Sequence, residues 1–307
     1  RMMEPFESDP QFRSYVITID AVAKTATLPG GASATFTSNG GCQSTADSAE
    51  ETIRIMVSQS GALVLYTQFK TSSGRDITIG LPDQTLPLTE LAGTWNIAAW
   101  GPVAPTSFVA DIGQATFDNA GNVTALSSCV GLNACVAETG ALPKMAVNAT
   151  NGGFDVSQGG VATGRAFAFK TLAGKAAFVN IADDGTFVVG TRQESLGALA
   201  AVNTVSNFRQ FELNRNGTIG DLLDDTVTVT ANDATARTIT RLRTSDRRAD
   251  TLGVDKPRNG LRYRAANSCT IDNAPVNCRE FVQLPMQGMG ITLSLSVGTT
   301  LPPFFDV

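Results

Sequence analysis

The sequence predicts an all-β protein made of antiparallel meander units, either β-barrels or β-sandwiches, with at most one short helix. Charged residues account for only 17% of the 307 residues and Gly occurs 29 times, a composition that favours strands and turns over amphipathic helices. Hydrophobic residues reach 42%, which is enough for a sizeable core. Short stretches with alternating apolar residues recur along the chain, and clusters of Asn, Asp and Gly separate them.

The alternating stretches have the length of ordinary strands. In chain order they lie at 13–20, 62–69, 76–81, 107–117, 165–172, 175–181, 185–193, 226–231, 236–243 and 290–298. The Asn, Asp and Gly residues that tolerate positive φ in hairpins predict turns at 118–122, 182–185 and 214–217. One segment, 48–61, is ambiguous. Ser48 and Glu51 have the spacing of a helix capping box, but Ile53, Ile55 and Val57 fit a strand about as well.

Two weak internal similarities suggest repeated units. Residues 61–96 resemble 174–203, which puts Leu91 and Leu199 in equivalent places, and residues 127–145 resemble 267–287. They predict an N-terminal β-rich unit at 1–90, a central β unit at 91–198, and a C-terminal β unit at 199–307 with a basic insertion at 221–264. One continuous domain is the alternative organisation.

The five cysteines bear on the compartment. Cys129 and Cys135 are close in sequence, as are Cys269 and Cys278, and neither pair has CxxC spacing. They predict two local disulfides and therefore an oxidising compartment, which is the periplasm, the cell surface or the exterior. No apolar run begins the chain, so either the protein is cytosolic or a signal peptide has been removed. The predicted disulfides favour removal of a signal peptide. Cys42 then has no partner within the chain. It could be a buried thiol, an inter-chain disulfide partner or a modification site.

Several function classes are excluded or disfavoured. The chain has no His, so it has no Ser-His-Asp or Cys-His triad and no His-ligated zinc, and it lacks GxSxG and GxxxxGK[ST]. We expect no cofactor, no metal and no transmembrane segment. The net charge of −5 makes nucleic acid an unlikely partner. A glycan hydrolase would need a pair of catalytic carboxylates. The candidates are Asp183 and Asp184 in a predicted turn, and Asp221, Asp224 and Asp225 in a predicted acidic loop.

A basic cluster spans residues 237–264. Its nine basic and three acidic residues carry a formal charge of +6. By strand periodicity Arg241 and Arg243 share one face, and so do Arg262 and Arg264. Such an arginine-lined hairpin could bind an anionic polysaccharide or surface component. The favoured alternative is a solvated outer face that pairs with the acidic remainder of the chain.

The stretch LAGTWNIAAWGP at 91–102 contains both tryptophans, Trp95 and Trp100. Because they are five residues apart, a regular strand points them to opposite sides. We expect Trp95 to lie in the core and Trp100 to be available for surface contacts.

Gly93-Thr94-Trp95 resembles the GxW signature of the calycin group, which includes lipocalins and avidins. The stretch FVADIGQATFDNAGNVTAL that follows is similar to the early strands of an avidin-like barrel. The resemblance covers 91–198. It implies that the tryptophan packs across the closed end of an eight-stranded barrel and that the barrel has a small-ligand cavity. It implies no particular ligand, because no tryptophan follows Trp100, whereas avidins enclose their ligand with several later ones.

Taken together, these features favour an extracytoplasmic, non-catalytic binding or adhesion module. Its candidate ligand-binding residues are Trp100, Arg241, Arg243, Arg262 and Arg264. One alternative is a structural or assembly subunit of a surface layer or fibre, whose partners would be copies of itself. A second alternative is a glycan hydrolase that uses paired carboxylates.

Overall fold

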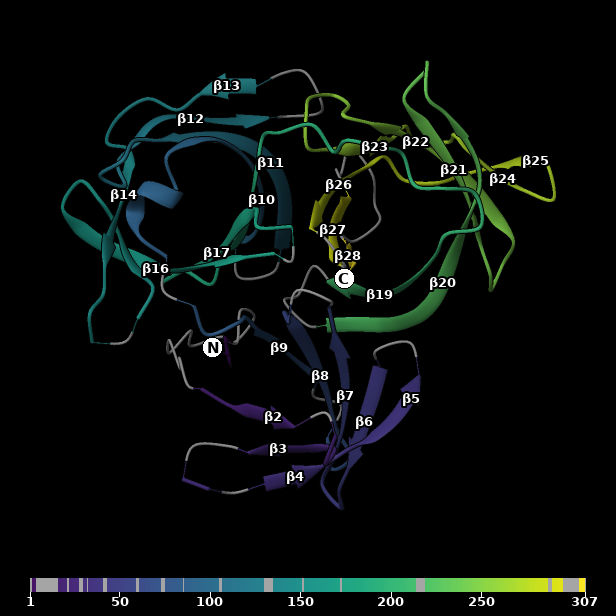
Figure 1. The fold of residues 1–307 in the computed structure, drawn as a ribbon, viewed down its shortest axis with the longest axis horizontal. Coiled ribbons are helices and arrows are strands. Elements are labelled where there is room, and N and C mark those ends of the chain that lie inside the picture. The colour runs from purple at the N-terminus through teal and green to yellow at the C-terminus, as the bar shows by residue number, and fades with distance from the viewer. Residues whose placement is uncertain are drawn as a thin grey trace.

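The computed structural model describes residues 2–3, 16–20, 22–27, 30–31, 33–40, 43–58, 61–72, 75–84, 86–104, 107–129, 135–150, 152–171, 173–213, 219–286, 289–294 and 304–306. Within these residues the fold is all-β, as predicted, and the only helical element is the 3-10 turn η1 (Leu88–Glu90). Three antiparallel sheets pack around a shared core (Figure 1). Cys42, the turn predicted at 214–217, and parts of the strands predicted at 13–20 and 290–298 lie outside the described residues.

The N-terminal sheet has the strand order β1-β9-β8-β7-β6-β5. Its strands are β1 (Met2–Met3), β5 (Thr37–Gly40), β6 (Gln43–Asp47), β7 (Glu51–Val57), β8 (Leu63–Phe69) and β9 (Arg75–Gly80). A separate small sheet contains β2 (Thr18–Asp20), β3 (Thr25–Thr27) and β4 (Ser33–Thr35).

The segment 48–61, which the sequence leaves ambiguous, contains strand β7 and, in its described residues, no helix. The Ser48 hydroxyl does accept hydrogen bonds from the backbone of Glu50 (3.2 Å) and Glu51 (3.0 Å), but it does so in the turn between β6 and β7. β7 is paired along its length with β8 on one side and with β6 on the other. These two ladders, together with the β-branched side chains of β7, outweigh a local capping signal.

The central sheet is a meander in which each strand follows its neighbour in sequence. Its strands are β10 (Gly93–Ala104), β11 (Ser107–Phe117), β12 (Val123–Cys129), β13 (Cys135–Ala137), β14 (Pro143–Val147), β15 (Phe154–Gln158), β16 (Val161–Lys170), β17 (Ala176–Ala182) and β18 (Phe187–Arg192). β18 returns to pair with β10, and a bridge between Asn122 and Lys144 joins the start of β12 to β14. These eight strands, without the short β13, therefore curl into what we call the central ring (Figure 1).

The C-terminal sheet also closes on itself. Its eight-membered circuit, which we call the C-terminal ring, contains β19 (Val205–Leu213), β20 (Ile219–Asp233), β21 (Thr238–Arg243), β22 (Arg248–Val254), β23 (Arg262–Arg264), β26 (Phe281–Met286), β27 (Met289–Ser294) and β28 (Phe304–Asp306). Each strand pairs antiparallel with the next, and β28 pairs with β19. The hairpin of β24 (Cys269–Ile271) and β25 (Ala274–Val276) extends from β22.

The basic segment 221–264 spans β20 to β23, which are four strands of this ring. Residues 221–225 are strand within β20, so the expectation of an acidic loop there is wrong. The turns predicted at 118–122 and 182–185 are confirmed. In the first, the Asp118 carboxylate accepts hydrogen bonds from the backbone of Ala120 and Asn122 (2.9 Å each), and in the second Asp184 accepts one from Thr186 (2.8 Å).

The two tryptophans occupy different cores. Trp95 lies in the apolar cluster inside the central ring, 5.1 Å from Phe178 and 6.4 Å from Phe117 between ring centroids. Trp100, on the other face of β10, stacks on Phe187 at 5.5 Å and is 0% exposed. Its cluster joins all three sheets and includes Tyr66 and Ile79 of the N-terminal sheet, and Phe211, Val282 and Leu284 of the C-terminal ring.

The expectation that Trp100 is available for surface contacts is therefore wrong. Alternation along the strand does send the two tryptophans to opposite faces of β10. However, the outer face of β10 is not a surface of the protein, because two further sheets pack against it.

Candidate functional site

The arginines of the basic cluster lie on the inner face of the C-terminal ring. Arg241 is opposite Asp250 across the β21–β22 ladder, and Arg262 is opposite Val254, so these residues share one face of the sheet. That face also carries the buried apolar side chains Ile239, Leu252, Val254 and Phe281. The alternate residues of β26, Val282 and Leu284, point outward into the core shared by the three sheets. Arg264 faces inward with Arg262, two residues away.

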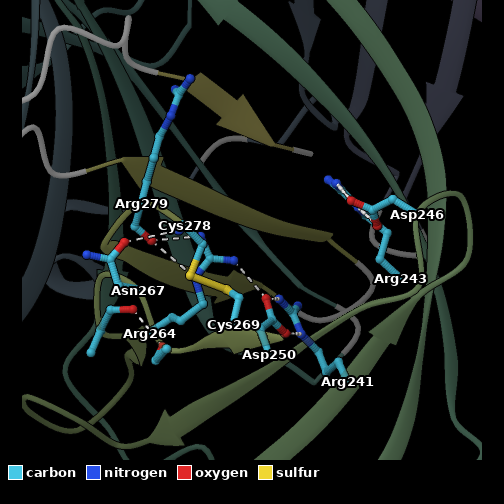
Figure 2. The surroundings of a disulfide bond; sticks show 11 residues. Arg241, Arg243, Asp246, Asp250, Arg264, Asn267, Cys269, Cys278 and Arg279 are labelled. Carbon is cyan, nitrogen blue, oxygen red and sulfur yellow. Dashed lines mark hydrogen bonds and ion pairs between the residues drawn. A yellow bond between two sulfur atoms is a disulfide. The ribbon is translucent and has the colours of Figure 1, made fainter. Parts of the chain in front are cut away.

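Asp250 is held between two arginines (Figure 2). Arg241 donates to both carboxylate oxygens at 3.1 Å, and Arg264 donates to one of them at 2.9 Å. The side chains of Arg264 and Asp250 are only 2% and 6% exposed. Burial by itself would raise the pKa of Asp250, but the charges and hydrogen bonds of the two arginines outweigh it and lower the pKa to about 2.

The Cys269–Cys278 disulfide supports this cluster. Asn267 closes its loop by donating from the backbone to the Cys278 carbonyl at 2.8 Å and by accepting from the Cys278 backbone N–H at 3.3 Å. The next residue, Arg279, thereby presents its carbonyl oxygen to Arg264, which donates to it at 2.7 and 3.1 Å (Figure 2). The Arg264 guanidinium also lies 4.1 Å from the centre of the Phe281 ring. Both predicted disulfides, Cys129–Cys135 and Cys269–Cys278, are confirmed.

Arg243 has its own carboxylate partners. Its Nε donates to Asp246 at 2.7 Å, and Asp225 lies 3.8 Å away. The hydrogen bond from Arg243 is the main cause that lowers the pKa of Asp246 to about 2. Elsewhere in the basic cluster, Arg237 pairs with Asp255, and Arg247 pairs with Asp272 at the surface. Among these described pairs, the expected pairing with the acidic remainder of the chain is thus limited to Asp225 and Asp272, whereas Asp246, Asp250 and Asp255 belong to the cluster itself.

Arg262 differs from the other inward-facing arginines. Its Nη1 donates to Gln283 Oε1 at 3.2 Å, whereas its buried Nε has no hydrogen-bond partner. No carboxylate among the described residues comes within 4.0 Å of it to form an ion pair. Burial, and then the positive charge of Arg241, lower the pKa of Arg262 to about 10. The negative charge of Asp255 acts on Arg262 in the opposite direction, but Asp255 is itself paired with Arg237. Arg262 is still charged at neutral pH, so it is a buried cation that makes no ion pair with a carboxylate of the described residues.

Three of the carboxylates considered for hydrolysis, those of Asp184, Asp224 and Asp225, have structural partners. Asp184 organises a turn, and Asp225 pairs with Arg243. Asp224 accepts two hydrogen bonds from the buried Arg209, at 2.6 and 3.1 Å, and lies 3.5 Å from Arg54 of the N-terminal sheet. Sequence patterns did not indicate this last group, because its members are far apart in the chain. The side chain of Asp221 lies outside the described residues.

The described ranges contain no helix that is both long enough and apolar enough to cross a membrane. They also contain no grouping of three or more His, Cys, Asp or Glu residues that could hold a metal ion. No protein-family model, curated protein or solved structure matches this chain.

Proposed function

We propose that the protein is an extracytoplasmic, non-catalytic binding module that holds an anionic group on the inner face of its C-terminal ring. The observation that carries this proposal is Arg262, whose desolvated guanidinium has no carboxylate partner among the described residues. A buried charge is costly unless an opposite charge accompanies it. A ligand that supplies this opposite charge would relieve the cost.

The charges around Arg262 favour an anion over a cation. Arg241 and Arg264 share the carboxylate of Asp250, and Asp255, whose charge acts on Arg262, is already paired with Arg237. These four arginines and two carboxylates leave a formal excess of two positive charges. A carboxylate suits this site because its two oxygens match the planar fork of a guanidinium. The acidic sugar units of an anionic polysaccharide carry such carboxylates. We therefore assign the ligand role mainly to Arg262, with Arg241 and Arg264 providing the surrounding positive charge.

The compartment and the central ring fit the same interpretation. Two disulfides favour an oxidising environment outside the cytoplasm. We further propose that the central ring is calycin-like. Trp95 lies inside the ring and its indole N–H donates to the Leu91 carbonyl at 2.6 Å, while the Arg192 guanidinium covers the indole at 4.8 Å and donates to the Glu90 carbonyl. These contacts cover one end of the ring, where the calycin tryptophan would pack.

The substitution Arg262→Met tests the anion site in two ways. It should raise the stability of the free protein and abolish the further stabilisation that an anionic ligand gives. Without ligand we expect the variant to be more stable than the wild type by about 1–2 kcal/mol, because a desolvated charge has been replaced by an apolar side chain of similar length. A short oligogalacturonate should raise the melting temperature of the wild type but not that of the variant. Thermal unfolding followed by circular dichroism, with and without the oligosaccharide, measures both effects.

Two controls accompany this experiment. Maltotetraose is uncharged and should stabilise neither protein. Arg247→Met removes an arginine whose side chain is 69% exposed, and it should respond to oligogalacturonate as the wild type does. Equal stabilisation of wild type and Arg262→Met by oligogalacturonate would place the anion elsewhere, and no stabilisation of the wild type would remove the support for this ligand class.

A further inference from the structure

A loop of the C-terminal ring reaches across to the central ring. This loop, residues 255–261, joins β22 to β23. Asp255 orders it by accepting hydrogen bonds from the backbone of Leu196 (2.9 Å) and Gly260 (3.0 Å). The Asn259 carbonyl accepts a hydrogen bond from Asn96 of β10 at 2.8 Å. Gly260 has φ +83°, and a side chain there would meet the Arg192 carbonyl at 2.9 Å, so the loop lies directly against the central ring.

Arg258 extends from this loop to the Cys129–Cys135 disulfide. Its Nε donates to Asn96 Oδ1 at 3.0 Å and its Nη2 to the Gly113 carbonyl at 3.3 Å, which fixes the guanidinium against β10 and β11. Its Nη1 lies 3.5 Å from the Cys135 sulfur, and both Nη atoms lie 3.7 Å from the Cys129 sulfur. Burial lowers the pKa of Arg258, and no ion pair joins it to a carboxylate in the described ranges.

The two cysteines differ in their exposure. Cys129, at the end of β12, is 1% exposed, whereas Cys135, at the start of the short edge strand β13, is exposed. Of the two residues, Cys135 is therefore the one at which we expect a thiolate from solution to attack. The sulfur released by such an attack would be the buried one of Cys129, beside the Arg258 guanidinium.

We propose that Cys129–Cys135 is a site of thiol–disulfide exchange with an external thiolate, and that Arg258 stabilises the leaving group. The incoming thiolate attacks the Cys135 sulfur and forms a mixed disulfide with it. The Cys129–Cys135 bond breaks, and its electron pair stays on Cys129 as a thiolate that pairs with Arg258. A second external thiol can then release Cys135 from the mixed disulfide as the external reagent becomes oxidised. Such exchange is faster when the departing sulfur is the more stable thiolate, which a neighbouring guanidinium provides.

The second disulfide supplies an internal reference. Cys269 and Cys278 are 1% and 8% exposed, so an external thiolate can attack neither sulfur readily. We therefore expect glutathione to open Cys129–Cys135 while Cys269–Cys278 is still intact. Timed alkylation followed by peptide mass spectrometry measures the two bonds separately in the same folded molecule.

The decisive comparison is between Arg258→Gln and Arg258→Lys. Loss of the positive charge in Arg258→Gln should slow the opening of Cys129–Cys135 by about tenfold, because the leaving thiolate loses its partner. Arg258→Lys keeps the charge and should open at close to the wild-type rate. Arg247→Gln, which removes an exposed arginine, should not change the rate. A purely structural role for Arg258 predicts the opposite change in Arg258→Gln, namely faster opening of Cys129–Cys135. Loss of the side chain would then loosen the loop and expose the disulfide.

A second measurement needs no variant. When Cys129–Cys135 is reduced in the wild-type protein, the pH dependence of Cys129 alkylation should give an apparent pKa below the ordinary thiol value of about 8.5. An unchanged or faster opening in Arg258→Gln, or a Cys129 thiol that titrates at or above about 8.5, would overturn the proposal.

Discussion

Replacing Asp250 with Asn should lower the free energy of unfolding by about 3–5 kcal/mol, because it leaves two buried guanidinium groups without their carboxylate. The side chain of Arg264 is 2% exposed and that of Arg241 is 15% exposed, so water cannot take over the role of Asp250 at Arg264 and can do so only in part at Arg241. The amide of Asn can accept a hydrogen bond but carries no negative charge. Denaturant unfolding at neutral pH, followed by circular dichroism, measures this loss.

The same substitution should change how stability depends on pH. The pKa of Asp250 is about 2 in the folded protein, below its ordinary value of 3.8. A carboxyl group with a lowered folded-state pKa stabilises the protein fully above its unfolded-state pKa, and this contribution is lost as the pH falls through the folded-state value. The contribution of Asp250 should therefore be present above about pH 4 and disappear towards pH 2. Between pH 4 and pH 2, Asp250→Asn should lose less stability than the wild type.

Asp272→Asn is the matched control for Asp250→Asn. Asp272 also pairs with an arginine, at 2.7 Å, but its side chain is 65% exposed and that of Arg247 is 69% exposed. Exposed ion pairs of this kind contribute little to stability, so this variant should unfold close to the wild type at all pH values. If Asp250→Asn and Asp272→Asn lowered the free energy of unfolding by the same small amount, Asp250 would not be the counter-ion of a buried cluster.

Replacing Trp100 with Ala should also cost about 3–5 kcal/mol, the usual range when a large buried aromatic side chain is removed. The cavity would lie in the core that joins the three sheets, where Trp100 is 0% exposed and stacks on Phe187. We therefore expect weaker cohesion between the sheets as well as lower total stability. Trp95 would be the only tryptophan left in this variant, so its fluorescence would report the unfolding of the central ring alone.

In Trp100→Ala, the Trp95 fluorescence transition should separate from the circular dichroism transition, which reports all three sheets together. Trp100→Phe retains an aromatic ring to stack on Phe187 and should lose clearly less stability than Trp100→Ala. A Trp100→Ala variant with wild-type stability would contradict the position of Trp100 in the shared core and restore its role at a surface.

Much of the secondary structure could be predicted from local patterns. Alternation and β-branched residues predicted β8, β9 and β11 to within about one residue, and Asp118 and Asp184 mark real turns. One prediction was wrong and one segment stayed ambiguous for a common reason. Residues 221–225 suggested a loop, and Ser48 and Glu51 left 48–61 open between helix and strand. Each segment is held in a strand by a neighbouring strand that the local sequence does not reveal.

The sequence also found the arginines of the candidate site, but not their surroundings. Period-two spacing correctly put Arg241 with Arg243, and Arg262 with Arg264, on common faces. It could not say that both faces are the same inner face, because that depends on how β21, β22 and β23 curve to close the C-terminal ring. The contacts of Arg258 with the Cys129–Cys135 disulfide were equally hidden, since more than 120 residues separate Arg258 from either cysteine.

The sequence by itself determined the all-β class, the two disulfides and the concentration of positive charge in residues 237–264. These features depend on residue type and on near neighbours in the chain. Only the tertiary structure decided which faces of the strands are buried, which arginines have carboxylate partners, and that Arg258 lies beside the Cys129–Cys135 disulfide. Those outcomes depend on the closure and packing of sheets between residues distant in sequence, and burial in turn sets the cost of each charge. An arginine on an outer face keeps its hydration, whereas an arginine on the inner face of a ring loses it and is costly unless an opposite charge lies nearby.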